Sequence, residues 1–185
     1  MKTKIFFLLL IISIPFFLPA QTTQKNTQLP KAFFQQLNKV SASFALPKDF
    51  EIVPIRQNDD VAYDFAMKST EKKIEIRYKF FDETSEQNVY MVLVTMCLNI
   101  NGGEVPQIGS YNPEDVQGEF NADFGYTCAV QANSEFSDGY SKCMISSITR
   151  IKKGTVYKFF LFDDINVVQE HMFRDDVFHA LKFKK

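Results

Sequence analysis

Acidic and amide side chains gather in the segment Glu119-Phe-Asn-Ala-Asp123, with Asp115 four residues before it. Carboxylate and amide oxygens are the ligands that calcium takes in proteins. A twelve-residue calcium loop would require glycine where Phe124 stands and a bidentate acid where Val130 stands. The sequence therefore favours a solvated loop with an Asn-Ala-Asp turn over the alternative of a calcium site, and we predict no metal and no cofactor.

We expect a ligand to bind at this acidic segment and at the irregular residues just before it. Prolines and glycines interrupt residues 104–118, which makes this the longest irregular stretch, with room for one helical turn at 113–117. Binding residues concentrate on irregular segments that a rigid sheet carries. The residues that we predict to bind a ligand weakly are Tyr111, Asp115, Glu119, Asn121, Asp123 and Tyr126.

The two histidines restrict the catalytic chemistry that the chain could perform. His171 and His179 are eight residues apart, whereas a helical zinc site places its histidines at i and i+4. The chain also lacks the Gly-x-Ser-x-Gly turn of many serine hydrolases. We therefore assign no catalytic residue, and the alternative is a hydrolase, metal-independent or calcium-assisted, that uses Asp163, Asp164 or His171.

Three cysteines leave one unpaired if a disulfide forms. Cys128 and Cys143 lie in two strand patterns, and the residues at 133–139 that connect these patterns favour a turn. In a hairpin centred there, both cysteines face each other within about a residue of register. The sequence predicts a Cys128–Cys143 disulfide, with two reduced, buried thiols as the alternative. Cys97 lies in an apolar segment and is predicted to be an unreactive core residue.

The N-terminus carries an export signal. Lys2 and Lys4 precede an apolar run at residues 5–17, which is shorter than the roughly 20 residues of a membrane-spanning helix. The run is followed by Leu18-Pro-Ala20, so residues 1–20 are predicted to be a signal peptide that is cleaved after Ala20. The mature chain would be secreted or periplasmic, without a transmembrane span, and would begin with a flexible leader at 21–28.

Length and composition predict one folded domain. The chain has 185 residues, and domains usually have about 100–200, so residues 29–185 are expected to form a single globular α+β domain. Hydrophobic residues make up 45% and charged residues 23%, which argues against disorder because both values are typical of globular proteins. The net charge of −1, without a basic face, makes nucleic acid an unexpected partner.

The apolar periodicity predicts the order of the elements. We expect a helix at residues 29–40, strands at 43–46, 50–56, 61–68 and 72–81, a buried helix at 89–100, the cysteine hairpin, a strand at 155–162 and a closing helix at 167–181. In the segment 72–81 apolar residues alternate with charged ones such as Glu75 and Arg77. This alternation predicts that one face of the sheet meets water.

The order of elements, with Pro47 and Phe50 after the opening strand Phe44-Ala-Leu, resembles the PsbP-like extrinsic proteins and their exported bacterial relatives. The resemblance implies an α+β fold, an α/β/α sandwich with a largely antiparallel sheet flanked by helices. It also implies a binding or assembly accessory rather than an enzyme. No functional residue can be transferred from it.

These observations predict an exported, non-catalytic domain that binds a protein or a small molecule through the segment 104–118 and one sheet edge. The alternatives are the hydrolase described above and a structural protein of the cell envelope. An enzyme would gather its polar residues in one partly buried pocket and shift their pKa values, whereas a binding module would show them dispersed.

Overall fold

The computed structural model describes residues 28–71 and 73–185, so the predicted signal peptide and most of the predicted leader lie outside the described residues. The larger sheet has seven strands in the order β2-β3-β4-β8-β7-β6-β5, and every neighbouring pair is antiparallel. Its strands are β2 (Phe50–Ile52), β3 (Phe65–Ser69), β4 (Ile74–Phe81), β5 (Ile108–Ser110), β6 (Phe124–Gln131), β7 (Lys142–Arg150) and β8 (Gly154–Phe162). A smaller sheet pairs β1 (Ala42–Phe44) with β9 (Leu181–Phe183).

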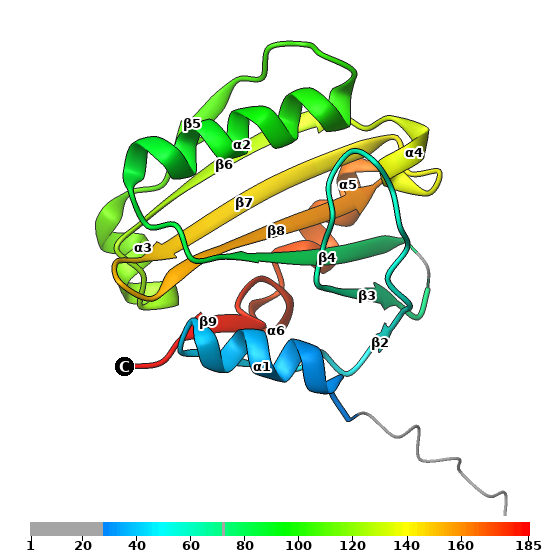
Figure 1. The fold of residues 1–185 in the computed structure, drawn as a ribbon. Helices are drawn as coiled ribbons and strands as arrows, with labels where there is room; N and C mark the ends of the chain where they lie inside the picture. The colour runs from blue at the N-terminus through cyan, green and yellow to red at the C-terminus, as the bar shows by residue number, and fades with distance from the viewer. Residues whose placement is uncertain (1–27, 72) are drawn as a thin grey trace, which may run out of the picture.

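Helices cover both faces of the larger sheet (Figure 1). The long helix α2 (Glu86–Asn101) and the short helix α4 (Ser134–Ser137) lie on one face. The opposite face is covered by α1 (Lys31–Lys39), α3 (Pro113–Phe120), the smaller sheet, α5 (Ile165–Val167), a π-helical turn η1 (Val168–Met172) and α6 (Asp175–Phe178). This arrangement confirms the α+β class and the sandwich of helices around an antiparallel sheet.

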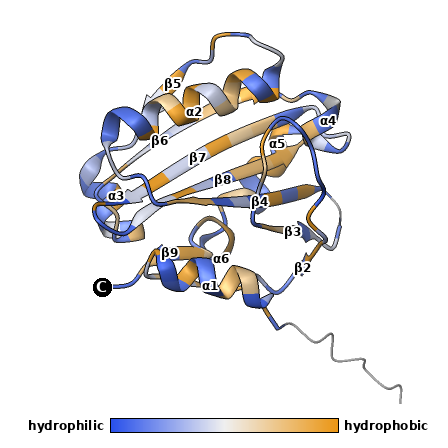
Figure 2. Cartoon of the chain, in the orientation of Figure 1, coloured by the Kyte–Doolittle hydropathy of each residue, from blue (hydrophilic) through white to orange (hydrophobic). Residues whose placement is uncertain are grey.

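Each face of the sheet has its own hydrophobic core. The core on the α1 face is rich in aromatic rings, and Phe33 of α1 stacks on Phe65 of β3 with ring centroids 3.8 Å apart. The core on the α2 face contains all three cysteines. In Figure 2 both α1 and α2 carry orange and blue residues side by side, as expected of helices that turn one side toward a sheet.

Helix α2 forms where the sequence predicts a helix, because it has signals for both ends. The hydroxyl of Ser85 accepts a hydrogen bond from the backbone amide of Asn88, and Gly102 ends the helix in the left-handed conformation with φ of 76°. The residues that α2 buries recur at helical spacing: Val89, Leu93, Met96, Cys97 and Ile100. One side of α2 is thereby fixed on the sheet.

The prediction that one face of the sheet meets water is wrong. Glu75 and Arg77 of β4 are only 6% and 1% exposed, because the loop before β3 and helix α4 cover them. Arg77 donates hydrogen bonds to Glu75, Asp138 and the carbonyl of Phe136. Hydrogen-bonded partners of opposite charge allow a charged side chain to remain buried, so alternation of charge alone did not indicate solvent.

The segment 104–118 is more ordered than its composition predicts. It contains the edge strand β5 and most of α3, which begins at Pro113 as expected and extends three residues beyond the predicted turn. The side chain of Asn112 accepts a hydrogen bond from the amide of Glu114, and Asn121 ends the helix with φ of 53°. The irregular part is therefore confined to the residues before β5 and to the two residues that join β5 to α3.

The predicted closing helix at 167–181 is broken into several pieces. Arg174 has an extended backbone, and its guanidinium bridges Asp49 and Asp176, so the chain turns there. Leu181 then enters β9, which pairs with β1. Apolar spacing alone predicts one helix. The break at Arg174 is not visible in that spacing, because it depends on an ion pair with Asp49, which is distant in the sequence.

The predicted Cys128–Cys143 disulfide is wrong. Cys97 is a buried core residue as predicted, but it forms a disulfide and is not unreactive. The structure joins Cys97 of α2 to Cys128 of β6 and leaves Cys143 free and buried. The β6–β7 register places Ile145 opposite Cys128, two residues from the predicted partner. The connection between β6 and β7 contains helix α4 where a tight turn was expected, and α2 packs over β6 so that Cys97 reaches Cys128.

None of the helices within residues 28–71 and 73–185 is both long and apolar enough to cross a bilayer.

Candidate functional site

A groove of about 400 Å³ opens on the α2 face, between α2 and the loop of residues 57–63, and we name it the α2 groove. Strand β4 contributes its floor. Its apolar lining residues are Val61, Ala62, Phe81, Met91, Val92 and Met96. Its polar lining residues are Asp60, Lys79, Thr95 and Asn99. The groove thus combines an apolar surface with a few polar groups, as small-molecule sites do.

Helix α2 forms one wall of the groove with the side chains next to its buried stripe. Met91 is 53% exposed, whereas Met96 is nearly buried, so the helix presents sulfur-containing side chains at both the rim and the floor. Thr95 lies between them on the same wall and donates its hydroxyl to the carbonyl of Met91. Methionine is flexible and polarisable, which suits it to contact ligands of different shapes.

The loop of residues 57–63 forms the opposite wall, and a turn at Asn58 shapes it. The carboxamide oxygen of Asn58 accepts hydrogen bonds from the amides of Asp60 and Val61, at 3.1 and 2.8 Å. The side chain of Asn99 on α2 donates to the carbonyl of Asp60 at 3.0 Å. This bond joins the two walls at one end of the groove.

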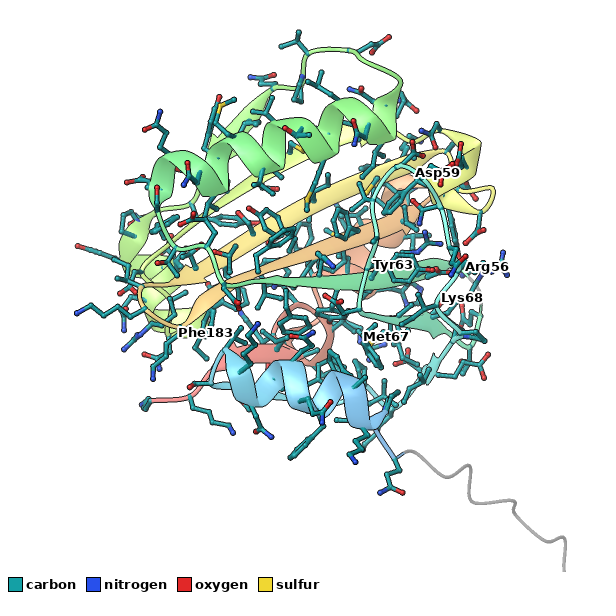
Figure 3. The ribbon with its side chains drawn as sticks, in the orientation of Figure 1. Arg56, Asp59, Tyr63, Met67, Lys68 and Phe183 are labelled. Carbon is teal, nitrogen blue, oxygen red and sulfur yellow. A yellow bond between two sulfur atoms is a disulfide. The ribbon has the colours of Figure 1, made fainter. Side chains whose placement is uncertain are left out.

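Polar contacts also hold the loop against α4. The Arg56 guanidinium pairs with Asp138 at 2.8 Å, and the Arg56 amide donates to the hydroxyl of Tyr63 at 2.8 Å. At the tip of the loop, the Asp59 amide donates to Glu135 at 3.2 Å. Figure 3 shows Asp59 at this tip, with Arg56 and Tyr63 on the two arms. These hydrogen bonds and the ion pair fix the loop at several points, so it forms a defined wall of the groove.

The floor of the groove carries a cation that already has a partner. The Lys79 ammonium lies 3.4 Å from Asp64 and also over the ring of Phe81, 5.6 Å from its centroid. Asp64 in turn accepts a hydrogen bond from the amide of Phe80 at 2.9 Å. The charge of Lys79 is thus balanced within the protein.

Asp60 has no such partner for its second carboxylate oxygen. Its Oδ2 atom is buried, and among the described residues no donor forms a hydrogen bond with it. The side chain belongs to the lining of the α2 groove. An unsatisfied carboxylate oxygen is costly to bury, so the Asp60 carboxylate, which lines the groove, indicates where a ligand cation would be stabilised.

The residues predicted to bind a ligand lie elsewhere in the structure, and three of them are dispersed. The Tyr111 hydroxyl contacts Ser146 at 3.0 Å, whereas the Tyr126 hydroxyl donates to Glu86 of α2 at 2.9 Å. Burial, and to a smaller extent the hydrogen bond to the carboxylate of Glu86, raises the pKa of Tyr126 to about 12. Asp115 is an exposed residue in the first turn of α3.

The other three predicted residues connect α3 to neighbouring elements. Glu119 lies 3.2 Å from the His179 ring of α6. Asn121 donates to the carbonyl of Lys184, and Asp123 accepts from the amide of Ile151 at 2.7 Å. Within the described part of the chain, no group of three or more His, Cys, Asp or Glu side chains is arranged to hold a metal ion. Ligand binding by these six residues stays a prediction.

The residues of the alternative hydrolase have separate roles in the structure. Asp163 accepts a hydrogen bond from the amide of Ser141, and Asp164 caps α5 through the amide of Asn166. His171 lies 3.8 Å from Glu170. The hydrogen bonds and ion pairs of the described residues do not link either aspartate to His171.

Sequence reasoning missed a buried lysine on the α1 face. Lys158 of β8 is fully buried, donates to the carbonyl of Phe178 at 3.2 Å and lies over the rings of Phe120 and Phe178. Burial lowers the pKa of Lys158 to about 7, although the charge of Glu119 opposes this shift. Its single charged position in an otherwise apolar strand, Val-Tyr-Lys-Phe-Phe, was the signal that could have identified it.

The α2 groove was also missed, because its walls are distant in the sequence. The sequence predicts strands at 50–56 and 61–68, whereas β3 begins at Phe65, four residues later, and the residues before it form a wall of the groove. The exposed side of α2, with Met91 and Thr95, was the remaining signal.

Comparisons with known proteins give limited information. No protein-family model matches the chain, and no curated protein matches it. Among solved structures, the solution structure of cyanobacterial PsbP (CyanoP) from Synechocystis sp. PCC 6803 is similar, with 14% identity and a TM-score of 0.45. The alignment covers 79% of this chain and 88% of that chain. The likeness concerns overall layout alone, and no residue role is transferred from it.

Proposed function

We propose that this chain is an exported, non-catalytic binding protein that holds a small, mostly apolar molecule in the α2 groove. The observation that carries the proposal is the groove itself, about 400 Å³ of largely apolar lining beside one unsatisfied carboxylate oxygen. Ligand pockets usually measure about 300–1,000 Å³ and have an apolar lining with a few polar groups. The groove therefore suits a ligand of one to three rings.

The chemistry of the lining supports binding rather than catalysis. Among the described residues that line the groove, none is His, Cys or Ser. Its hydroxyl, on Thr95, is donated to a helix carbonyl, and its cation, Lys79, is paired with Asp64. Nucleophilic catalysis requires a nucleophile within reach of a general base, and this lining does not supply such a pair.

Export is part of the same proposal and rests on the N-terminal sequence. Lys2 and Lys4 followed by the apolar run at 5–17 have the pattern of a cleaved signal peptide. The Cys97–Cys128 disulfide is compatible with an oxidising compartment. Mass spectrometry of the native protein should find a mature chain that begins at or near Gln21.

Dye binding tests the groove. N-phenyl-1-naphthylamine is a neutral dye with a naphthalene and a phenyl ring whose fluorescence rises in apolar surroundings, and we expect it to bind saturably to the mature protein. Thr95→Trp should weaken this binding by about tenfold or more, because the larger side chain fills the groove from the exposed wall of α2.

The matched control for the dye experiment is Gln87→Trp, which adds the same side chain at an exposed position of α2 outside the groove lining. This variant should keep the wild-type affinity within about twofold. Absence of saturable binding, or equal affinity in Thr95→Trp and Gln87→Trp, would contradict the proposed function.

A further inference from the structure

The charge balance of the α2 groove indicates what kind of ligand it takes. Two ionisable side chains line it, Asp60 from the loop and Lys79 from β4. Lys79 lies 3.4 Å from Asp64, and both side chains are about four-fifths buried, so salt screens this pair only weakly. Asp60 therefore remains as the uncompensated charge of the groove.

The surroundings of Asp60 fix its backbone and leave its carboxylate without a hydrogen-bond partner among the described residues. Its backbone amide donates to Asn58 and its carbonyl accepts from Asn99, so both backbone groups of the residue are occupied. The Oδ2 atom is buried and has no hydrogen-bond donor among the described residues. The nearest loop cation in the sequence, Arg56, is paired with Asp138. A fixed anion thus borders an apolar surface.

We propose that the α2 groove selects an amphipathic amine, with an apolar body against Met91, Met96 and Phe81 and an ammonium group at Asp60. This inference rests on the proposed function and adds the chemical class of the ligand. An ammonium in the groove would neutralise the Asp60 carboxylate and donate to it, and charge-assisted hydrogen bonds are about twice as strong as neutral ones. An anionic ligand would instead meet the like charge of Asp60.

Three matched probes test the selectivity: 1-naphthylmethylamine, 1-naphthylmethanol and 1-naphthylacetate, which carry the same ring system with a cationic, a neutral and an anionic group. Calorimetric titration at neutral pH and low salt should give a dissociation constant for the amine about tenfold below that of the alcohol. The acetate should bind most weakly. Added salt should reduce the advantage of the amine.

The variant Asp60→Asn separates the charge from the shape. It should weaken amine binding by about tenfold and leave alcohol binding within about twofold, because the side chain keeps its size. Asp59→Asn is the control, since Asp59 is exposed and does not line the groove. Unchanged melting temperature and retained alcohol binding show that Asp60→Asn is folded.

The outcomes separate the two proposals. If the alcohol binds as tightly as the amine, or if Asp60→Asn leaves the preference for the amine unchanged, the inference about ligand class is wrong while the groove remains a binding site. If neither these probes nor N-phenyl-1-naphthylamine binds saturably, the proposed function fails, and the inference fails with it.

Discussion

Among the described residues, each face of the sheet fully buries one cation, and the two cations have different partners. Arg77 of β4 and Lys158 of β8 belong to neighbouring strands, where Arg77 is paired with Phe159 and Lys158 with Tyr78. On the α2 face, Arg77 bonds to two carboxylates and a carbonyl. On the α1 face, Lys158 bonds to one carbonyl.

The difference between these cations shows how a fold can accommodate a buried charge. A guanidinium with carboxylate partners keeps its charge, since the partners replace the water that it has lost. An ammonium between aromatic rings has less compensation, so burial lowers its pKa, here to about 7. We therefore expect the α2 face to depend on its charge network and the α1 face to respond to pH.

Removal of Arg77 should produce the largest effect. Arg77→Met leaves Glu75 buried without its closest partner, and we expect the free energy of unfolding to fall by about 3–5 kcal/mol. Urea denaturation of the purified variant measures this change. The control is Arg56→Met, which removes an exposed cation from the same network and should cost about 1 kcal/mol or less. Similar losses in both variants would show that the buried position of Arg77 is unimportant.

The disulfide should be the next largest contribution to the α2 face. Cys97 and Cys128 are separated by 31 residues, and closing a loop of that length stabilises a protein by about 3–4 kcal/mol in the chain-entropy model. Cys97→Ala should remove this stabilisation, whereas Cys143→Ala should cost less because that thiol is free. Peptide mapping without reduction should recover the Cys97–Cys128 pair, and recovery of Cys128–Cys143 would contradict the structure.

Removal of the buried charge of Lys158 should raise the free energy of unfolding, whereas removal of Arg77 should lower it. Because the pKa of Lys158 is about 7 in the folded protein and near 10.5 when unfolded, the unfolded chain binds more protons between these values. The contribution of Lys158 to the free energy of unfolding should therefore rise by up to about 1.4 kcal/mol per pH unit between pH 7 and 10.5. Below pH 7 both states are charged and its contribution stays constant.

Lys158→Met is the test of this pH dependence. The variant should be more stable than wild type by about 2 kcal/mol at pH 7, because it no longer buries an ionisable amine. Its stability should also be flatter from pH 7 to 10 in urea denaturation. Lys153→Met, at an exposed turn, should keep the wild-type profile. A wild-type pH profile in Lys158→Met would show that the buried amine is not the responsible group.

Sequence patterns predicted the parts of this fold that local signals determine. The caps of α2 at Ser85 and Gly102 and the apolar stripe between them are such signals, and α2 forms as expected. Charge alternation in β4 misled the prediction because the covering of Arg77 depends on Asp138, which is 61 residues away. The α2 groove was not predictable for the same reason, since its walls meet only through contacts such as Asn99 with Asp60.

The smallest expected effect is at the turn between β7 and β8, the strands that both faces share. Asp123 accepts a hydrogen bond from the amide of Ile151 in this turn at 2.7 Å, and Arg150 lies at the edge of ion-pair distance, 4.0 Å. Asp123→Ala should lower the free energy of unfolding by about 1 kcal/mol, the usual net value of one such bond. Because the Asp123 carboxylate accepts this hydrogen bond without calcium, the loss of stability should be the same with calcium or with chelator. Thermal unfolding under both conditions measures it, and a stabilisation by calcium that disappears in Asp123→Ala would assign this residue to an ion site instead.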